Sequence, residues 1–198
     1  MDLRIAFIPV GRFDVAEVEA VATRVAKVIH GTVELREPAP VPKAGDDPGR
    51  KQHLAGPMLG ALRADLPRLK AAKRIGSTPG TAAPPGPPDL AMFFTDVDLF
   101  RPQTDGVFGE IDAKGKAAVL SSRRLLEAFY KRKTDPVKQR ARLVKLTLMT
   151  LGRLRGLPDC GDRGCAMFTT AALADVDLKP EKYCASCWHR LSTGGFHI

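Results

Sequence analysis

The chain has 198 residues, of which 44% are hydrophobic, and its 31 Lys and Arg residues exceed its 22 Asp and Glu residues to give a net charge of +9. This length and apolar content are typical of one globular protein with a sizeable core and exclude wholesale disorder. No stretch approaches the roughly 18 apolar residues of a membrane span, and the start lacks the basic region and cleavage site of a secretory signal, so we expect a cytoplasmic protein without membrane contact.

The start of the chain predicts a β-α-β unit. Residues 3–10 form a short apolar run that predicts a buried strand, and residues 32–37 alternate between apolar and polar as a second strand does. The intervening residues 14–31 predict a helix, because Asp14 and Glu17 fit a capping box and valines recur at helical spacing. This opening indicates the α/β class, with a parallel or mixed sheet covered by helices.

The stretch up to residue 156 predicts further elements of both kinds. Two stretches rich in Pro and Gly, 38–49 and 77–88, predict loops. The predicted helices are 50–65 with a break at Gly56-Pro57, 123–133 and 136–156, and the predicted strands are 89–100, 106–112 and 116–122. Asp96 and Asp98, in the most hydrophobic of these strands, are expected to be turn or capping residues rather than catalytic carboxylates.

All four cysteines lie in the last quarter of the chain, in two close pairs. The pairs are Cys160 with Cys165 and Cys184 with Cys187. In a reducing compartment such spacing is typical of metal ligands, and two pairs that approach from tight turns suit tetrahedral zinc. Four thiolates complete the coordination shell, so the predicted site is structural and binds one Zn²⁺. The alternative is four free or oxidised thiols.

The spacing around these cysteines resembles that of the archaemetzincins, a family of zinc metallopeptidases of the metzincin clan. Their signature is H-E-x-x-H-x-x-G-x-x-H-C, followed by x4-C-x-M and, further along the chain, by C-x-x-C. In this sequence Gly156, Cys160, Cys165, Met167 and the pair at 184 and 187 fall in register. The segments 95–100, 107–110, 120–125 and 177–184 are also similar to the family, so the resemblance covers most of the chain.

The catalytic positions of this signature carry other residue types. In register, Met149, Arg153 and Asp159 stand at the three zinc-binding histidines, and Thr150 stands at the general-base glutamate. Two histidines on one helical face hold the metal, and the glutamate deprotonates its bound water. A thioether is a weak ligand, threonine is no base near neutral pH and arginine stays charged. The resemblance therefore implies a metallopeptidase homologue that is catalytically inactive and has no catalytic zinc.

The resemblance also implies an architecture, a metzincin-like mixed, twisted sheet flanked by helices. An N-terminal α/β subdomain of residues 1–156 would include the active-site-type helix 136–156 under a cleft. A small zinc-stabilised C-terminal subdomain of residues 157–198 would follow in the same compact unit. Met167 corresponds to the methionine of the turn beneath the catalytic site, although its position equally fits an ordinary core residue. Because a cation and an anion replace two metal ligands, one hypothesis is that Arg153 and Asp159 form an ion pair. The alternative is a solvent-facing Arg153 with no partner.

Three functions remain open. The first is a structural-zinc protein that binds a peptide or protein in the former active-site cleft. The second is an active zinc-dependent peptidase or aminopeptidase with a rearranged site, whose ligands would have to come from His30, His53, His189 and His197. The third is a zinc-stabilised nucleic-acid binder that uses the basic run from Lys131 to Arg155. We favour it least, because the run lacks the interleaved aromatic residues that stack on bases.

Overall fold

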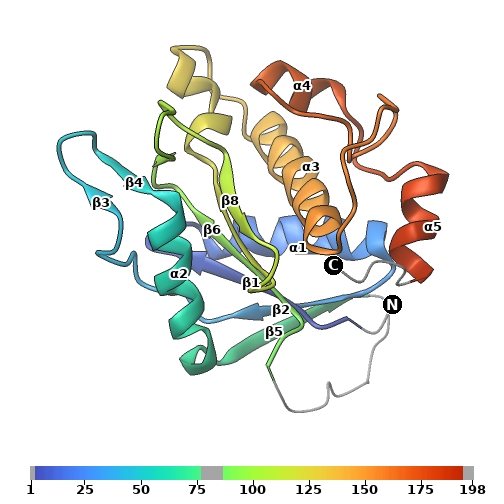
Figure 1. The fold of residues 1–198 in the computed structure, drawn as a ribbon, viewed down its shortest axis with the longest axis horizontal. Coiled ribbons are helices and arrows are strands. Elements are labelled where there is room, and N and C mark those ends of the chain that lie inside the picture. Colours follow the sequence, from blue (N-terminus) through green and yellow to red (C-terminus); the bar gives the residue numbers. More distant parts are fainter. Residues whose placement is uncertain (1–2, 77–86, 194–198) are drawn as a thin grey trace.

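The central feature of the fold is a six-stranded mixed sheet, seen in a computed structural model that describes residues 3–76 and 87–193 (Figure 1). Its strand order is β5-β2-β1-β6-β9-β8, with parallel pairing through the four inner strands and antiparallel pairing at both edges. The strands are β1 (Ile5–Val10), β2 (Thr32–Arg36), β5 (Ala71–Gly76), β6 (Leu90–Thr95), β8 (Gly109–Asp112) and β9 (Ala117–Ser121). The α/β class with a mixed sheet is thus confirmed.

The two faces of the sheet are covered by different helices. Alternate residues of β1 point to opposite faces. Ile5 and Phe7 join the core formed with α1 (Val15–Ile29) and α3 (Pro136–Leu154), whereas Ala6, Ile8 and Val10 join the core formed with α2 (Ala55–Asp65). Figure 1 shows α2 on one side of the sheet and α3 on the other. The larger core therefore lies beneath α3, the helix that carries the candidate catalytic positions.

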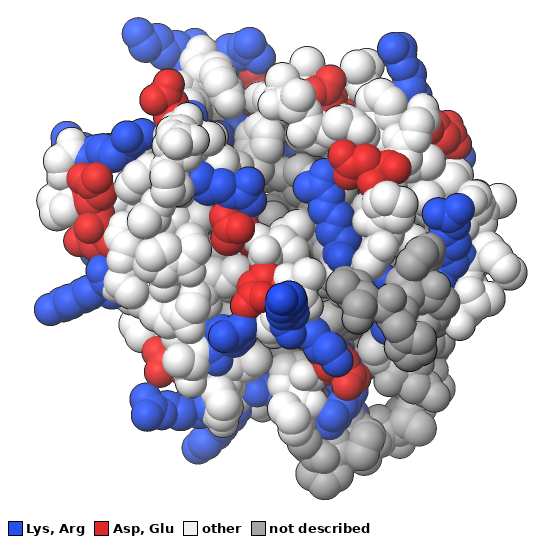
Figure 2. Space-filling model, viewed as in Figure 1, with Lys and Arg blue, Asp and Glu red and all other residues white. Residues whose placement is uncertain are grey.

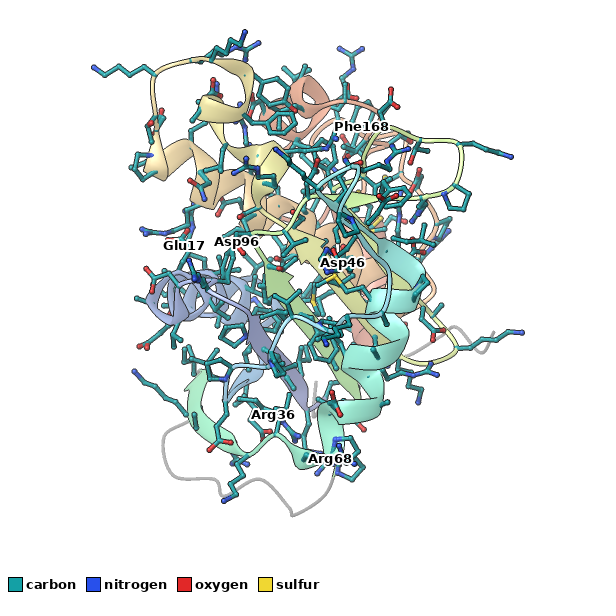
Figure 3. All side chains as sticks on the ribbon, turned by 90° about the vertical axis from the view of Figure 1, so that its left-hand side faces the viewer. Glu17, Arg36, Asp46, Arg68, Asp96 and Phe168 are labelled. Carbon is teal, nitrogen blue, oxygen red and sulfur yellow. The ribbon has the colours of Figure 1, made fainter. Side chains whose placement is uncertain are left out.

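Helix α1 begins as predicted, but its cap is simpler than a capping box. The side chain of Asp14 accepts a hydrogen bond from the backbone N–H of Ala16. The carboxylate of Glu17, labelled in Figure 3, accepts from the guanidinium of Arg140 on α3. The helix ends at His30, whose φ of 48° is left-handed. Glu17 thus joins α1 to α3.

The predicted helix 50–65 starts too early, and the predicted strand 89–100 ends too late. Residues Gln52–Leu54 form β4, which pairs with β3 (Asp46–Asp47) and β7 (Leu99–Phe100) in a small second sheet. Helix α2 begins only at Ala55, so Pro57 falls in its first turn, where proline is tolerated. Strand β6 ends at Thr95, because the hydroxyl of Thr95 accepts from the N–H of Val97 and turns the chain.

The predicted helix 123–133 is replaced by two short 3₁₀ helices, η2 (Arg123–Leu125) and η3 (Glu127–Tyr130). The physical reason is Arg142 of α3, which is fully buried. Its guanidinium donates to the carbonyl of Leu125 at 2.6 Å and to the carboxylate of Glu127. A carbonyl held by this side chain is not used by a continuing helix, so the segment bends around Arg142.

The chain after α3 packs on the same core as the sheet. The remaining elements are η1 (Leu66–Arg68), α4 (Leu173–Leu178) and α5 (Ala185–Thr193). Leu157, Met167 and Val176 belong to the hydrophobic cluster that also holds Phe7. A subdomain boundary at residue 156 stays a prediction.

Two other expectations concern the loop at 77–88 and contact with a membrane. Most of the predicted loop 77–88 lies outside them. Across the part of the chain that is described, no helix combines the length and hydrophobicity that crossing a membrane requires.

Candidate metal centre and cleft

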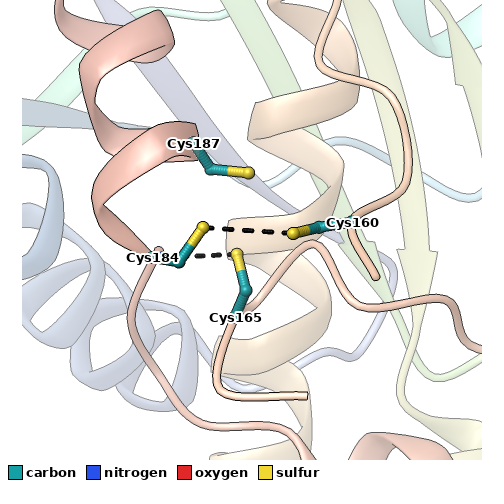
Figure 4. A group of neighbouring side chains, drawn as sticks. All are labelled: Cys160, Cys165, Cys184 and Cys187. Carbon is teal, nitrogen blue, oxygen red and sulfur yellow. Dashed lines mark hydrogen bonds between the residues drawn. The ribbon is translucent and has the colours of Figure 1, made fainter. Parts of the chain in front are cut away.

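The four cysteines converge on one point beside α5 (Figure 4). Their Sγ atoms all lie within 4.8 Å of one another, and those of Cys160 and Cys184 are 3.9 Å apart. Four sulfurs around a tetrahedral zinc, with Zn–S about 2.3 Å, lie roughly 3.8 Å from one another. The cluster could therefore bind zinc with little movement. All four are free thiols in this structure.

Backbone hydrogen bonds and burial affect the thiols of this cluster. The Sγ of Cys165 accepts from the backbone N–H groups of Met167 at 3.4 Å and Cys184 at 3.3 Å. Burial raises the pKa of Cys165 and of Cys187, whereas the backbone N–H of Cys187 lowers the pKa of the Cys184 thiol. Buried thiolates without a counter-charge are unfavourable, and a divalent cation at the centre would supply that charge.

Met167 joins the cysteine cluster to the base of α3. It is fully buried, and its Sδ lies 2.3 Å from the place that a Cβ on Gly152 would occupy. Only glycine allows the turn to pack so closely against the helix. The carbonyl of Met167 in turn accepts from the N–H of Cys160 at 2.9 Å. The methionine is thus a core residue that packs against α3, and its role as the turn methionine of the family stays a prediction.

Three of the four residues that the sequence register predicts at the catalytic positions line one cavity of about 580 Å³. Met149, Thr150 and Arg153 form its α3 wall, while β8 and the segment before α4 form the walls beside it. Figure 2 shows this face of the molecule with a hollow above its centre. We call this cavity the α3 cleft.

The predicted ion pair is present at the edge of the α3 cleft. Nη2 of Arg153 lies 2.6 Å from Oδ1 of Asp159, and Nε of the same guanidinium also donates to this oxygen at 3.2 Å. The other carboxylate oxygen, Oδ2, accepts from the hydroxyl of Thr169 at 3.3 Å. Asp159 is therefore committed to protein partners.

Lys179 is a further charged group beside this cleft, and no motif or spacing in the sequence points to it. Its side chain is buried, and Nζ donates to Sδ of Met149 and to the carbonyl of Ala166, both at 3.1 Å, and to the carbonyl of Phe168 at 2.9 Å. Burial, together with the nearby charge of Arg153, lowers the pKa of Lys179 to about 8. An ammonium group thus contacts the side chain that stands at the first histidine position.

Two more arginines line the α3 cleft, and sequence reasoning missed both. Nε of Arg124 donates to Oδ1 of Asp98 at 2.7 Å, and this hydrogen bond raises the pKa of Arg124. Nε of Arg101 donates to Glu110 at 2.5 Å. Asp98 also accepts from the side chain of Gln52 at 2.7 Å, so its carboxylate binds two side chains and does not have the turn or capping role expected of it.

The histidines among the described residues do not assemble a second metal site. Within residues 3–76 and 87–193, the cysteine quartet is the one group of three or more His, Cys, Asp or Glu side chains placed to hold an ion. His53 lies 3.8 Å from Asp46 in the small sheet, and His30 packs against Trp188. His197 lies outside the described residues.

Most of the basic run from Lys131 to Arg155 is engaged within the protein. Six of its nine basic residues contact an acidic side chain or a backbone carbonyl, namely Arg132, Lys138, Arg140, Arg142, Lys145 and Arg153. Figure 2 shows acidic side chains interspersed with basic ones over the face it presents, rather than a single basic patch. Nucleic-acid binding through this run stays an untested prediction.

Comparison with known proteins places this geometry in a family. The sequence model of Peptidase family M54 matches residues 89–193, which include α3, the α3 cleft and all four cysteines. The chain belongs to this family. The archaemetzincin of Thermococcus kodakarensis is 31% identical over 144 residues, which cover 73% of this chain and 68% of that one. The archaemetzincin resemblance of the sequence is thereby confirmed.

Other M54 relatives match shorter stretches. The archaemetzincins of Methanocaldococcus jannaschii and Methanopyrus kandleri are 32% and 35% identical over 110 and 99 residues, or 56% and 50% of this chain. These stretches span 62% and 53% of the two relatives, less than two thirds of their length.

Solved structures share the whole M54 fold. The zinc-dependent peptidase of Methanocorpusculum labreanum superposes with a TM-score of 0.79 at 26% identity, covering 94% of this chain and 99% of its own. The archaemetzincin of M. kandleri gives a TM-score of 0.73, also at 26% identity, covering 98% and 95%. The similarity therefore includes the N-terminal β-α-β unit, which the family model leaves out.

Proposed function

We propose that this chain is a non-catalytic member of family M54, in which one structural zinc is held by the four cysteines and the former active-site cleft binds a peptide or protein without hydrolysing it. The observation that carries this proposal is the contact between Arg153 and Asp159, with Nη2 and Oδ1 2.6 Å apart. These residues stand in register with two zinc-binding histidines of the family. An always-charged guanidinium cannot ligate a metal, and it removes the carboxylate beside it from metal binding.

The remaining charges at the α3 cleft work against a catalytic dication. The ammonium group of Lys179 contacts Met149, and Arg153 adds a second positive charge nearby. Two cations at close range repel a third ion strongly in a partly buried site. Thr150 is buried and offers no carboxylate to activate water. The residues at this cleft therefore do not fit a catalytic zinc, whereas the donor set of the cysteine cluster fits a structural one.

The edge of the sheet supports peptide binding. Strand β8 is the outer strand beside β9, and its residues Gly109 and Ile111 line the α3 cleft. An edge strand presents backbone N–H and C=O groups to which an extended peptide can add as a further strand. The cavity beside it can accept a side chain of that peptide.

The proposal is tested by hydrolysis and binding assays on one panel of labelled peptides. We expect no turnover above background, with or without added zinc, and binding that is reduced in Ala172→Trp, because the indole would fill the α3 cleft. Ala64→Trp, an exposed substitution on α2, is the matched control and should bind normally.

Two results would count against the proposal. Turnover that a chelator abolishes and zinc restores would show an active peptidase. Absence of binding to any peptide in the panel would remove the proposed role of the α3 cleft.

A further inference from the structure

The charged groups that line the α3 cleft are all of one sign. Its lining includes the guanidinium groups of Arg101, Arg124 and Arg153. No Asp or Glu is found among the described residues that line it. Each guanidinium is held by a carboxylate that does not line the cavity. These carboxylates belong to Glu110, Asp98 and Asp159, respectively. The walls therefore present cations to a ligand, while the compensating anions lie behind them.

The three guanidinium groups are held in the same way. Each uses Nε and Nη2 for its carboxylate or for a backbone carbonyl. Within the described part of the chain, no hydrogen bond involves Nη1 of any of the three, so these N–H groups can serve a ligand. Arg124 is fixed further by its packing against Gly106, where a Cβ would lie 1.9 Å from its Cζ. A guanidinium that is already oriented loses little freedom when it binds a carboxylate.

The rest of the α3 cleft is largely apolar. Its lining includes Leu146 and Met149 from α3, Ile111 from β8 and Leu120 from β9. Leu173, at the start of α4, lies on another wall. A site with an apolar floor and a few fixed polar groups fits a ligand that has the complementary distribution.

We infer that the peptide ligand of this cleft carries a carboxylate next to an apolar side chain, so that the side chain fills the cavity and the carboxylate meets the arginines. This inference rests on the proposed function and names its ligand class. The carboxylate can come from the C-terminus of the peptide or from an Asp or Glu side chain, and both present the same planar pair of oxygens. A free N-terminal amine is disfavoured, because its charge has the sign of the cleft.

The test uses four labelled peptides of one apolar sequence with the full-length protein. They combine a free or amidated C-terminus with Glu or Gln beside a central leucine. We expect peptides with a carboxylate to bind about tenfold more tightly than the amidated Gln peptide, since hydrogen bonds to charged groups contribute that much. Comparison of the free-terminus Gln peptide with the amidated Glu peptide distinguishes the two carboxylate sources. Binding of the favoured peptide should weaken in 1 M salt.

Variants of the cleft arginines test whether the tighter binding of carboxylate peptides arises in the α3 cleft. Arg153→Gln and Arg101→Gln should each reduce the advantage of the carboxylate peptides several-fold and leave the amidated Gln peptide unaffected. Arg63→Gln is the matched control, because it breaks an exposed ion pair with Asp112 and does not line the cavity. The thermal unfolding of each variant shows that it is folded.

The outcomes separate this inference from the proposed function. Equal binding of all four peptides, still blocked by Ala172→Trp, would overturn the carboxylate inference and leave peptide binding intact. Tighter binding of carboxylate peptides that Arg153→Gln and Arg101→Gln do not change would place the effect elsewhere and also overturn it. No binding of any peptide would remove both.

Discussion

The cysteine cluster and the α3 cleft lie at the same helix, but they are organised in different ways. Around the cysteines, four sulfur atoms within 4.8 Å of one another retain the full donor set of a zinc site. At the cleft, ion pairs of Arg153, Arg124 and Arg101 occupy the walls. One region is arranged around a place for a metal ion, and the other is stabilised by contacts between charged side chains.

The difference shows that the two regions can change independently. Loss of the cysteines would remove a shared centre on which the turns at 160–167 and α5 depend. Loss of catalytic ligands affects an open cleft whose walls are fixed by the sheet and by α3. Under the proposed function, the chain keeps the frame of a metallopeptidase although residues that do not bind zinc stand at its catalytic positions. The following predictions, from the largest expected effect to the smallest, test this contrast.

Replacement of two cysteines should have the largest effect. In Cys184→Ser/Cys187→Ser we expect loss of zinc and of the folded segment after residue 157, because binding of structural zinc supplies on the order of 10 kcal/mol in small zinc-held domains. Thermal unfolding and protease resistance measure the effect. Ser186→Ala, an exposed position between the two cysteines, is the control and should behave as wild type. Wild-type stability in the double variant would contradict a structural role.

Arg142→Met should be the most damaging single change among the ion pairs. The guanidinium is fully buried and contacts both Glu127 and Asp177, so its removal takes one cationic partner from each of these acidic groups. We expect a loss of about 3–5 kcal/mol in the free energy of unfolding, measured by denaturant titration. Arg140→Met, which breaks the more exposed pair with Glu17, should lose about 1 kcal/mol or less. Similar losses in both variants would contradict the account.

Stability should fall in acid through Asp177. Hydrogen bonding to Arg142 holds the pKa of this carboxyl below its usual value, so the unfolded state takes up a proton first. The contribution of Asp177 is therefore complete above its ordinary pKa of about 4 and is lost as the pH falls through the lower folded value. The melting temperature should fall more steeply below pH 4 in the wild type than in Asp177→Asn. Parallel curves would exclude this group as a source of acid sensitivity.

Arg153→Gln should have the smallest effect on stability. The side chains of the pair are 35% and 40% exposed, and ion pairs of this kind contribute less than about 1 kcal/mol. The melting temperature should change by no more than a few degrees, and 1 M salt should reduce the difference from wild type. A loss greater than about 2 kcal/mol would show that the pair is a structural element of the fold rather than part of an open cleft.

Local patterns predicted those parts of the molecule that depend on neighbouring residues. The strand at the N-terminus, the cap at Asp14 and the start of α3 at Pro136 follow from short-range rules and are confirmed. The boundary at Ala55 depends on the pairing of β4 with β7, which are more than forty residues apart in the chain. Such pairing leaves no periodic signal in either segment.

The candidate site shows the same limit. Spacing alone predicts that the cysteines form one cluster, and register with the family singles out Arg153 and Asp159. Lys179 and Arg142 could not be found in this way, because they contact residues 30 and 35 positions away, at Met149 and Asp177. An isolated lysine or arginine in the sequence predicts a solvated side chain, and only tertiary packing buries these two.

The zinc content per chain tests the central claim most directly. Elemental analysis of the purified wild type and of Cys184→Ser/Cys187→Ser should give one zinc and none, respectively, because the cysteines hold the ion and the α3 cleft holds none. Two zinc ions in the wild type, or one that survives in the double variant, would contradict the account and restore a catalytic metal to the cleft.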